Sequence, residues 1–310
     1  KKVNNEMKIL VLGAGAVGGY FGGRMAEAGM DVTFLVREKR QKKLEKSGLI
    51  IKSPKGDFAT SPNLVTIDNV DSIYDVILFT NKAYDLDEVL RSPFPVKDGS
   101  IIIPLLNGYA HMEQLRNKFP NARLFGGIAH IFSTLSEEGE VLHFNETHSL
   151  TFGHLREADK RDGRKFFDAC SSANFSIKYS DYINVDLWHK WILITTVAGA
   201  TTLFNATIGE IASTAHGRSF IKNLHDECIS VAKSEEIDVN ADELAQQRHF
   251  LSDKNSNWNS SMQRDMVNNS KIECEHIFLE LIKIADKNNV LCPSLKTAMI
   301  NGEVYMRSLV

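Results

Sequence analysis

Hydrophobic positions in the first part of the chain fall into short apolar runs separated by a segment with helical spacing. Residues 7–12 form an apolar, β-rich run, residues 17–28 carry apolar side chains at helical spacing and stop at Gly29, and residues 31–36 form a second run with β-branched side chains. Helical spacing of apolar residues indicates an amphipathic helix, and short apolar runs indicate strands. The pattern therefore predicts strand, helix and strand within about 30 residues, as in a βαβ unit.

Strand-like runs continue along the chain as far as Tyr179. They cover residues 75–80, 100–106, 124–132, 141–144, 149–152 and 176–179, with a hairpin turn at Glu138-Gly139 and helical stretches over 85–90 and 164–170. Such runs, bounded by turn residues and separated by helices, are typical of an α/β sheet. We therefore predict a Rossmann-type parallel-sheet domain over residues 1–180.

From Tyr182 onward few strand signals remain, and long segments carry apolar residues at helical spacing. These segments are residues 187–205, 219–234, 241–250 and 272–288. The predicted fold class is α/β, with the N-terminal Rossmann-type domain followed by a C-terminal all-helical domain over residues 181–310.

Length and charge agree with this division and narrow the classes of partner. The 310 residues leave room for two domains. With 36 Lys and Arg against 39 Asp and Glu, the net charge is −3, which argues against a surface built to neutralise nucleic-acid phosphates or to coat an anionic membrane. We expect neither nucleic acid nor a membrane as a partner, although a local basic patch stays open.

Several other site types are not expected from the sequence. The four cysteines form no C-x-x-C pair, which favours reduced thiols and a cytoplasmic protein. The longest apolar stretch, residues 192–204, is shorter than the roughly 20 residues that cross a bilayer. Residues 1–6 are polar and lead directly into a strand, which predicts no signal peptide and leaves open whether these six residues are native. The histidines show no metal-binding spacing, so we expect no metal site.

A glycine-rich turn lies between the first predicted strand and the first helix. Its sequence is Gly13-Ala14-Gly15-Ala16-Val17-Gly18, a G-x-G-x-x-G pattern. In a dinucleotide-binding turn the first glycine permits the tight turn, the second lets the backbone approach a pyrophosphate, and the third lets the helix pack against the strand. All six residues are therefore predicted to bind a dinucleotide cofactor. The alternative is a glycine-rich turn without a ligand.

The residue at the end of the second strand distinguishes between the two nicotinamide cofactors. A carboxylate there accepts from the ribose 2′-hydroxyl, whereas a guanidinium accommodates a 2′-phosphate. The residue is Arg37, and Lys39, Arg40, Lys42 and Lys43 follow it, which favours NADP(H). Two alternatives stay open, because Glu38 could turn inward and the basic run could be a solvated helix face.

Two further polar positions follow predicted strands. Lys82 comes after the run at 75–80, and Asn107-Gly108 follows the run at 100–106. Ligands of parallel sheets bind beyond the carboxyl ends of the strands. These residues are therefore candidates for the binding site, and from position alone each could equally be an ordinary loop residue.

Five separated motifs together resemble the ketopantoate reductase (2-dehydropantoate 2-reductase) family, over essentially the whole chain from Met7. They are GAGAVGGYFGG at 13–23, TNKAYDL at 80–86, LLNG at 105–108, LWHKW at 187–191, and SMQRD from 261 followed by Glu273. The resemblance implies a cytoplasmic NADP-dependent oxidoreductase that reduces the 2-keto acid 2-dehydropantoate to pantoate in pantothenate biosynthesis. It also implies a Rossmann domain on NADPH and a helical domain for substrate and dimerisation, and a homodimer is common in this family.

The resemblance further implies roles for individual residues. Lys190 is expected to be the catalytic acid, and Glu273 to act beside it by hydrogen-bonding near the cofactor and substrate hydroxyls. Lys82 and Asn107 are expected to line the cofactor and substrate sites, and Ser261 to contact substrate. Asn107 and Glu273 are thus expected to touch both ligands.

The chemistry of Lys190 is reasonable without the resemblance. Hydride transfer to a ketone leaves negative charge on its oxygen, which an ammonium group can stabilise and then protonate. Lys190 lies in the apolar segment LWHKWILI, where desolvation would lower its pKa and make it a better donor. The alternative is a lysine at a helix end that reaches water along its aliphatic stem.

The sequence departs from the family at positions that bind substrate. Where the family has asparagines four and eight residues after the catalytic lysine, this chain has Ile194 and Ala198, and a third asparagine corresponds to Ile208. Each lost hydrogen bond costs on the order of 1 kcal/mol, and up to ~3 kcal/mol where a buried group is left unpaired. Nearby hydroxyls could compensate, from Thr195, Thr196 or Thr201.

These departures keep other functions open. The substrate could be a less polar 2-keto acid, or the chain could be a related dehydrogenase for a hydroxy acid or a sugar phosphate. A protein of another class, which binds NADP(H) and signals its presence without turnover, would also fit the missing asparagines. The presence of both Lys190 and Glu273 favours catalysis.

Overall fold

The computed structural model describes residues 7–92 and 94–309. The expectations about residues 1–6 lie outside this part of the chain. By its internal contacts the chain divides into two compact units. The first holds the residues up to Leu106 together with His111–Asn184, and the second holds Asn107–Ala110 together with Val185–Val310.

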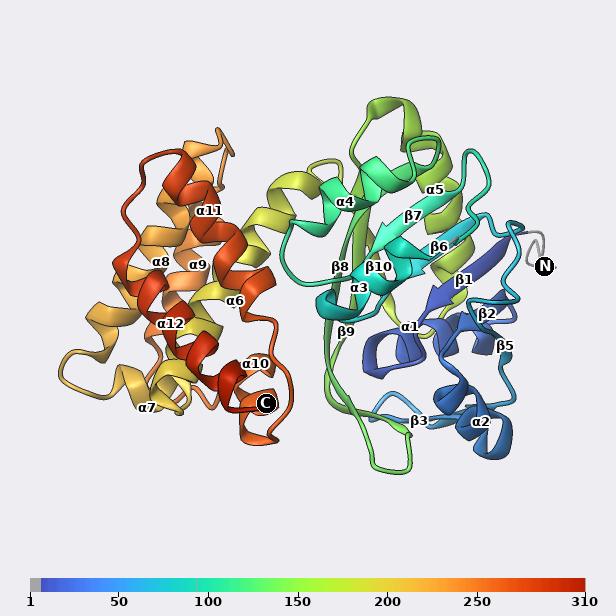
Figure 1. The fold of residues 1–310 in the computed structure, drawn as a ribbon, viewed down its shortest axis with the longest axis horizontal. Helices are drawn as coiled ribbons and strands as arrows, with labels where there is room; N and C mark the ends of the chain where they lie inside the picture. The colour runs from blue at the N-terminus through green and yellow to red at the C-terminus, as the bar shows by residue number, and fades with distance from the viewer. Residues whose placement is uncertain (1–6, 93, 310) are drawn as a thin grey trace. The chain divides into compact units, whose positions relative to one another are not determined.

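The first unit is built on a ten-stranded, mostly parallel sheet, which is seen at the blue and green end of Figure 1. Its order is β4-β3-β9-β8-β7-β6-β1-β2-β5, with β10 paired to β9. The strands are β1 Lys8–Leu12, β2 Asp31–Leu35, β3 Leu49–Lys52, β4 Phe58–Thr60, β5 Asn63–Val65, β6 Val76–Phe79, β7 Ile101–Pro104, β8 Arg123–Leu135, β9 Val141–His154 and β10 Ser176–Tyr179. Every residue of β6 and β7 is buried, as expected for strands covered on both faces.

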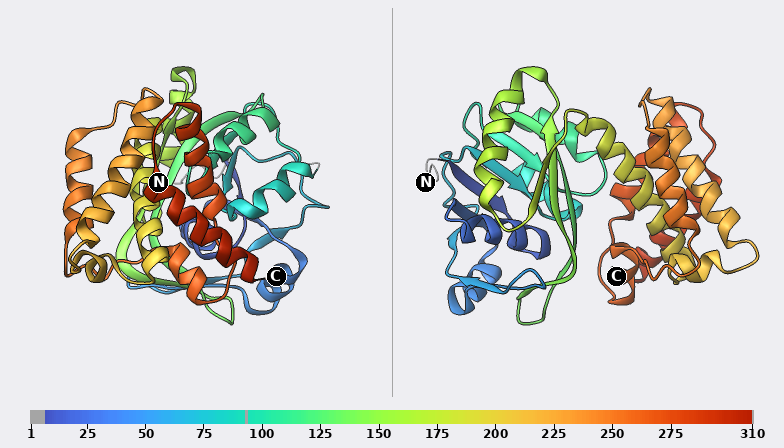
Figure 2. Two further views of the ribbon diagram at one scale, coloured as in Figure 1. Left: turned by 60° about the vertical axis from the view of Figure 1, so that its left-hand side comes forward. Right: turned by 180° about the vertical axis from the view of Figure 1, so that it is seen from behind.

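Helices cover the two faces of this sheet. They are α1 Ala16–Glu27, α2 Glu38–Ser47, α3 Ala83–Arg91, α4 His111–Lys118 and α5 Lys160–Ala169. The views in Figures 1 and 2 place α1 and α5 on one face and α3 and α4 on the other. Alternate strand residues face opposite ways, so Val11 packs in the cluster with Phe21 of α1 and Phe166 of α5, whereas Phe79 packs against Phe119 after α4.

The strands β8 and β9 form a long antiparallel hairpin with an irregularity in register between Ile131 and Ser133. The predicted turn at Glu138-Gly139 lies between them. The strands predicted at 141–144 and 149–152 are both present, but they are parts of one strand, because β9 is continuous from Val141 to His154. Residues 145–147 are exposed and polar and lie in the irregularity between the pairs Ile131–His148 and Ser133–His143, so the apolar signal lapses there.

The second unit is all helical, as drawn from yellow to red in Figure 2. It contains α6 Ile183–Phe204, which begins in the first unit, and then α7 Ile208–Ala212, α8 Gly217–Ser234, α9 Ala241–Ser252, α10 Ser261–Val267, a π-helical segment Glu275–Leu279, α11 Glu280–Lys287 and α12 Pro293–Ser308. The single helix predicted over 272–288 is therefore wrong in detail, since Ile272 and Glu273 precede helical structure and a π-helical turn interrupts it. The predicted fold class, α/β with an all-helical C-terminal region, is confirmed.

Helix α6 is the centre of the helical unit. Trp191 and Ile192 are almost fully buried within one apolar cluster that includes residues of α8, α11 and α12. A side chain at Gly199 would come within 2.8 Å of Leu224 in α8, which shows how closely these helices pack. Within residues 7–92 and 94–309, none of the helices has the length and apolar character needed to span a bilayer.

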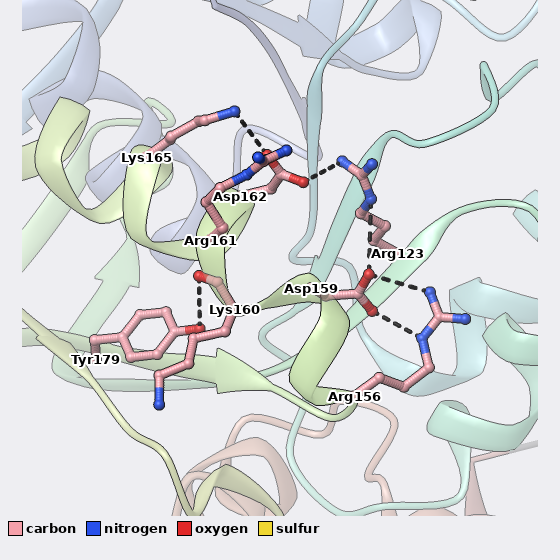
Figure 3. A network of polar contacts seen from close by, with 8 residues as sticks. All are labelled: Arg123, Arg156, Asp159, Lys160, Arg161, Asp162, Lys165 and Tyr179. Atoms are coloured by element: carbon pink, nitrogen blue, oxygen red, sulfur yellow. Dashed lines mark hydrogen bonds and ion pairs between the residues drawn. The ribbon is translucent and has the colours of Figure 1, made fainter.

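A network of ion pairs holds the start of α5 in the first unit, and Figure 3 shows it from close by. The buried Asp159 carboxylate accepts from Arg156 at 2.8 Å and lies 3.6 Å from Arg123, which also pairs with Asp162 at 2.8 Å. The hydrogen bond from Lys165 lowers the pKa of Asp162 below its ordinary value. Two arginines thus compensate the one buried carboxylate at this helix start.

Replacing Asp159 with asparagine should destabilise the first unit, because both arginines lose the carboxylate that they share. We expect the free energy of unfolding, measured by urea titration, to fall by about 2 kcal/mol. The matched control is Asp168→Asn, an exposed carboxylate on α5, which should change stability by less than about 0.5 kcal/mol. Equal losses for the two variants would contradict the role given to Asp159.

Candidate active site

The glycine-rich turn is held by very close packing. Gly13 has a φ of +98°, and a Cβ at Gly18 would lie 2.1 Å from the Gly13 carbonyl oxygen and 2.2 Å from Thr80 Oγ1. A Cβ at Gly15, by contrast, would meet nothing within 4 Å. Gly15 is also the N-cap of α1 and gives the helix no side-chain cap. The first amides of α1 therefore face open space beside Gly15, which fits the pyrophosphate of a dinucleotide.

One residue of the predicted basic run supports this turn. Arg40 donates from Nε and Nη2 to the Ala14 carbonyl oxygen at 3.1 and 2.7 Å, and from Nη1 to the Gly139 carbonyl oxygen at 3.0 Å. Partial burial lowers the pKa of Arg40. Lys43 of the same run donates to the Glu137 carbonyl oxygen. Two of these basic side chains thus bind backbone carbonyls, a role that the sequence did not indicate.

Arg37 and Lys82 occupy equivalent places after two strands of the parallel sheet. Arg37 is the N-cap of α2 after β2, and Lys82 is the N-cap of α3 after β6. Both therefore lie at the carboxyl edge where the glycine-rich turn follows β1. The Arg37 guanidinium forms ion pairs with Asp85 at 2.8 Å and Glu88 at 2.6 Å, and the Asp85 hydrogen bond raises its pKa.

Thr80 and Asn81 complete this edge; the sequence analysis included them in the motif TNKAYDL but gave neither of them a role. Thr80 Oγ1 donates to the Leu12 carbonyl oxygen at 2.8 Å, which ties the end of β6 to the glycine-rich turn. Asn81 Oδ1 is buried and has no hydrogen-bond partner among the described residues. A buried amide beside the turn is suited to a polar ligand group. Their place directly after a buried strand is the signal that could have identified them.

The predicted residue Asn107 belongs to the helical unit, although only two residues separate it from the end of β7. Gly108, with a φ of +81°, packs so closely that a Cβ would lie 3.0 Å from His276 Cδ2. The next residue, Tyr109, stacks on Trp191 with ring centroids 6.2 Å apart. The segment Asn107–Ala110 is thus packed onto α6 and the π-helical segment.

The same unit holds Lys190 and Glu273. Lys190 lies on α6 between Trp188 and Trp191, and it keeps part of its side chain exposed. Desolvation lowers the pKa of the Lys190 ammonium group to about 8, and the charge of Glu273 acts in the opposite direction. The two predicted catalytic residues are therefore close enough to interact electrically.

The π-helical segment links these groups. Trp191 Nε1 donates to the Ile277 carbonyl oxygen at 3.0 Å, and the Ile277 amide donates to the Glu273 carbonyl oxygen at 2.9 Å. These bonds join the indole of Trp191, the residue after Lys190 on α6, to the backbone of Glu273. π-Helical turns often occur at functional sites. Trp191 and His276 are site residues that sequence reasoning did not name, although the tryptophans of LWHKW were visible.

The remaining predicted substrate positions differ in accessibility. Ser261 is exposed at the start of α10, beside the helix cap Ser260. Ile194 is partly buried against the core of the helical unit, whereas Ala198 and Ile208 are buried within it. Of the positions where the family has asparagine, Ile194 alone keeps some exposed surface. The roles of all these residues stay predictions.

The described residues contain no group of three or more His, Cys, Asp or Glu side chains that could hold a metal ion. The four cysteines are buried thiols, and burial raises the pKa of Cys274 to about 11. The ammonium group of Lys190 and the carboxylate of Glu273, both in the helical unit, stay the predicted chemical groups, and the residues at the carboxyl edge of the sheet stay the predicted cofactor site.

Comparison with known proteins covers both units. A family model described as ketopantoate reductase PanE/ApbA matches residues 9–157, and a second, described as its C-terminal part, matches residues 182–300. An uncharacterized oxidoreductase of Bacillus subtilis (strain 168), YkpB, is 37% identical over 302 residues, which make up 96% of this chain and 99% of that protein. A 2-dehydropantoate 2-reductase of Streptococcus pyogenes is 23% identical over 269 residues, or 86% of this chain and 87% of that protein.

A solved structure agrees with the fold. The ternary structure of D-mandelate dehydrogenase with NADH and anilino(oxo)acetate has a TM-score of 0.87 and 21% sequence identity, and the match covers 98% of this chain and 99% of that one. The resemblance recognised in the separated motifs is confirmed by the two family models, which match in chain order over most of the sequence. The chain is an oxidoreductase of the ketopantoate reductase type and belongs to that family.

Proposed function

We propose that the chain reduces a 2-keto acid with NADPH, and that the first candidate substrate is 2-dehydropantoate, whose reduction to pantoate belongs to pantothenate biosynthesis. The observation that carries this proposal is the desolvated Lys190 ammonium group beside Glu273, in a chain of this family. The glycine-rich turn and Arg37 support a dinucleotide with a 2′-phosphate.

The bound nicotinamide supplies the hydride. Lys190 donates a hydrogen bond to the ketone oxygen and then its proton as negative charge develops there. A pKa of about 8 keeps this ammonium group protonated at neutral pH and makes it a stronger acid than an ordinary lysine. The Glu273 carboxylate favours the charged form of Lys190 and so prevents a larger fall in its pKa.

The other predicted residues bind and orient the ligands. The packing of Gly108 and Tyr109 on the helical unit holds the backbone next to Asn107 close to the helix that carries Lys190. Ser261 offers an exposed hydroxyl at the start of α10. In this proposal Asn107 and Ser261 form hydrogen bonds with polar groups of the substrate, and Lys82 contacts the cofactor.

A less polar 2-keto acid is a second candidate substrate, favoured by Ile194. This residue lies one helical turn after Lys190, on the same face of α6, and keeps part of its surface exposed. An apolar side chain there cannot pair with a substrate hydroxyl but can contact a methyl or aryl group. The D-mandelate dehydrogenase structure holds an aryl-substituted oxo acid within the same fold.

Replacing Lys190 with alanine should reduce kcat at least about 100-fold, because the acid that stabilises and protonates the ketone oxygen is removed. The reaction is followed by the loss of NADPH absorbance. Lys222→Ala, which removes an exposed lysine of α8, serves as the control and should keep the wild-type rate. Full activity in Lys190→Ala would show that another group is the acid.

The rate should also depend on pH in a defined direction. Since the pKa of Lys190 is about 8, its ammonium form predominates below pH 8, and the rate of reduction should fall as the pH rises through this value. The residual activity of Lys190→Ala should lack this alkaline fall. A wild-type rate that stays level up to pH 10 would exclude the assignment.

Two substrates that differ by one hydroxyl group test the choice between the candidates. These are 2-dehydropantoate and 3,3-dimethyl-2-oxobutanoate, and the first proposal expects the higher kcat/KM for 2-dehydropantoate. Ile194→Asn should move the ratio further toward the hydroxylated substrate, by about fivefold for one added hydrogen bond. A wild-type preference for the substrate without the hydroxyl would favour the second candidate. Absence of turnover with any 2-keto acid, despite NADPH binding, would rule out both and leave a non-catalytic NADP(H)-binding protein.

A further inference from the structure

Two carboxylates of α3 hold the side chain on which the choice between NADPH and NADH depends. Arg37 Nη2 lies 2.8 Å from Asp85 Oδ1 and 2.6 Å from Glu88 Oε2. The exposed fractions of the side chains are 65% for Arg37, 32% for Asp85 and 69% for Glu88. All three groups are thus within reach of a ligand in solution.

The backbone brings these side chains together from distant parts of the chain. Arg37 caps α2 at the end of β2, and α3 begins after β6, on the other side of β1. Residues three apart on a helix share a face, so Asp85 and Glu88 point the same way, whereas Asp87 does not lie on that face. The face of α3 that carries this pair is therefore turned toward the end of β2.

The charges around Arg37 do not favour the binding of an anion in addition to the two carboxylates. One guanidinium and two carboxylates carry a net charge of −1, and a phosphate monoester adds about −1.5 to −2 at neutral pH. In the nearby basic run Arg40 and Lys43 keep their positive charges but already donate to backbone carbonyls, while Lys39 and Lys42 are exposed. A 2′-phosphate must therefore displace the carboxylates from Arg37 or bind close to them.

The carboxylates also supply what NADH requires. A ribose that carries a free 2′-hydroxyl is bound by a carboxylate near the end of the second strand. Arg37 occupies that position in the sequence, but Asp85 and Glu88 reach the same place from α3. The two carboxylates can accept a hydrogen bond from a 2′-hydroxyl, and Arg37 beside them can donate hydrogen bonds to a 2′-phosphate.

We propose that Asp85 and Glu88 are specificity-determining residues for the cofactor. They compete with a 2′-phosphate for Arg37 and accept from a 2′-hydroxyl, so they reduce the preference of the chain for NADPH over NADH. This inference rests on the cofactor part of the proposed function and is independent of the substrate.

The test measures binding without turnover. Dissociation constants of NADPH and NADH are obtained by nicotinamide fluorescence for the wild type and for Asp85→Asn/Glu88→Gln, and competition with 2′,5′-ADP and 5′-ADP isolates the contribution of the 2′-phosphate. We expect the double variant to shift the NADPH to NADH affinity ratio toward NADPH by about tenfold at low ionic strength, and less at high salt. Asp87→Asn, on the other face of the same helix, is the matched control and should keep the wild-type ratio.

The role of Arg37 is tested in the same series. If the carboxylates act by holding Arg37, most of the gain should vanish when their variants are combined with Arg37→Ala. If the full shift toward NADPH persists without the Arg37 side chain, the carboxylates do not act by competing for Arg37. A change in the ratio below roughly threefold, a shift toward NADH, or an equal shift in Asp87→Asn would overturn the proposal. Failure to reduce any 2-keto acid would leave these binding results intact, so the two proposals can fail separately.

Discussion

The parallel pairing of β1 with β2 and β6 determines where the polar groups of the first unit lie. Parallel strands end at one edge, so the residues that follow them become neighbours however far apart they are in the sequence. The Thr80 hydroxyl makes this edge compact by bonding to the carbonyl that precedes the glycine-rich turn. Glycine at position 18 is required by the same packing, because any side chain there would overlap the turn and Thr80.

In the helical unit the main constraint is that Lys190 lies in an apolar environment. Desolvation lowers the pKa of the Lys190 ammonium group, while the Glu273 charge favours its protonated form. Trp191, which follows Lys190 on α6, donates a hydrogen bond to the carbonyl oxygen of Ile277, four residues after Glu273. The neighbour of Lys190 on α6 therefore anchors the π-helical segment that follows Glu273.

Much of the fold and part of the candidate site could be predicted from the sequence, where the pattern that indicates them lies within a few neighbouring residues. The glycine-rich turn, the buried strands and the long helices follow from spacing within a few residues, and the motif order indicated the family. The role of Arg40 could not be predicted, since its carbonyl partners, Ala14 and Gly139, are far away in sequence. Nor could the assignment of Asn107 to the helical unit, because the apolar run before it belongs to the sheet. The strands β4 and β5 were missed because each has only three residues and none of them is buried, and the four-residue β3 was also missed.

The basic residues show most clearly that composition gives the number of charges, whereas the structure gives the partner of each charge. The basic run after β2 was interpreted from its sequence as a field for a phosphate, yet electrostatic effects at short range depend on which partner each side chain meets. Arg37 meets two carboxylates, and Arg123 in the same unit lies between Asp159 and Asp162. In these pairs the positive charge is compensated before any ligand arrives. An anion that binds at such a site must exchange partners with an existing carboxylate, so its affinity depends on the acids nearby as much as on the arginine itself.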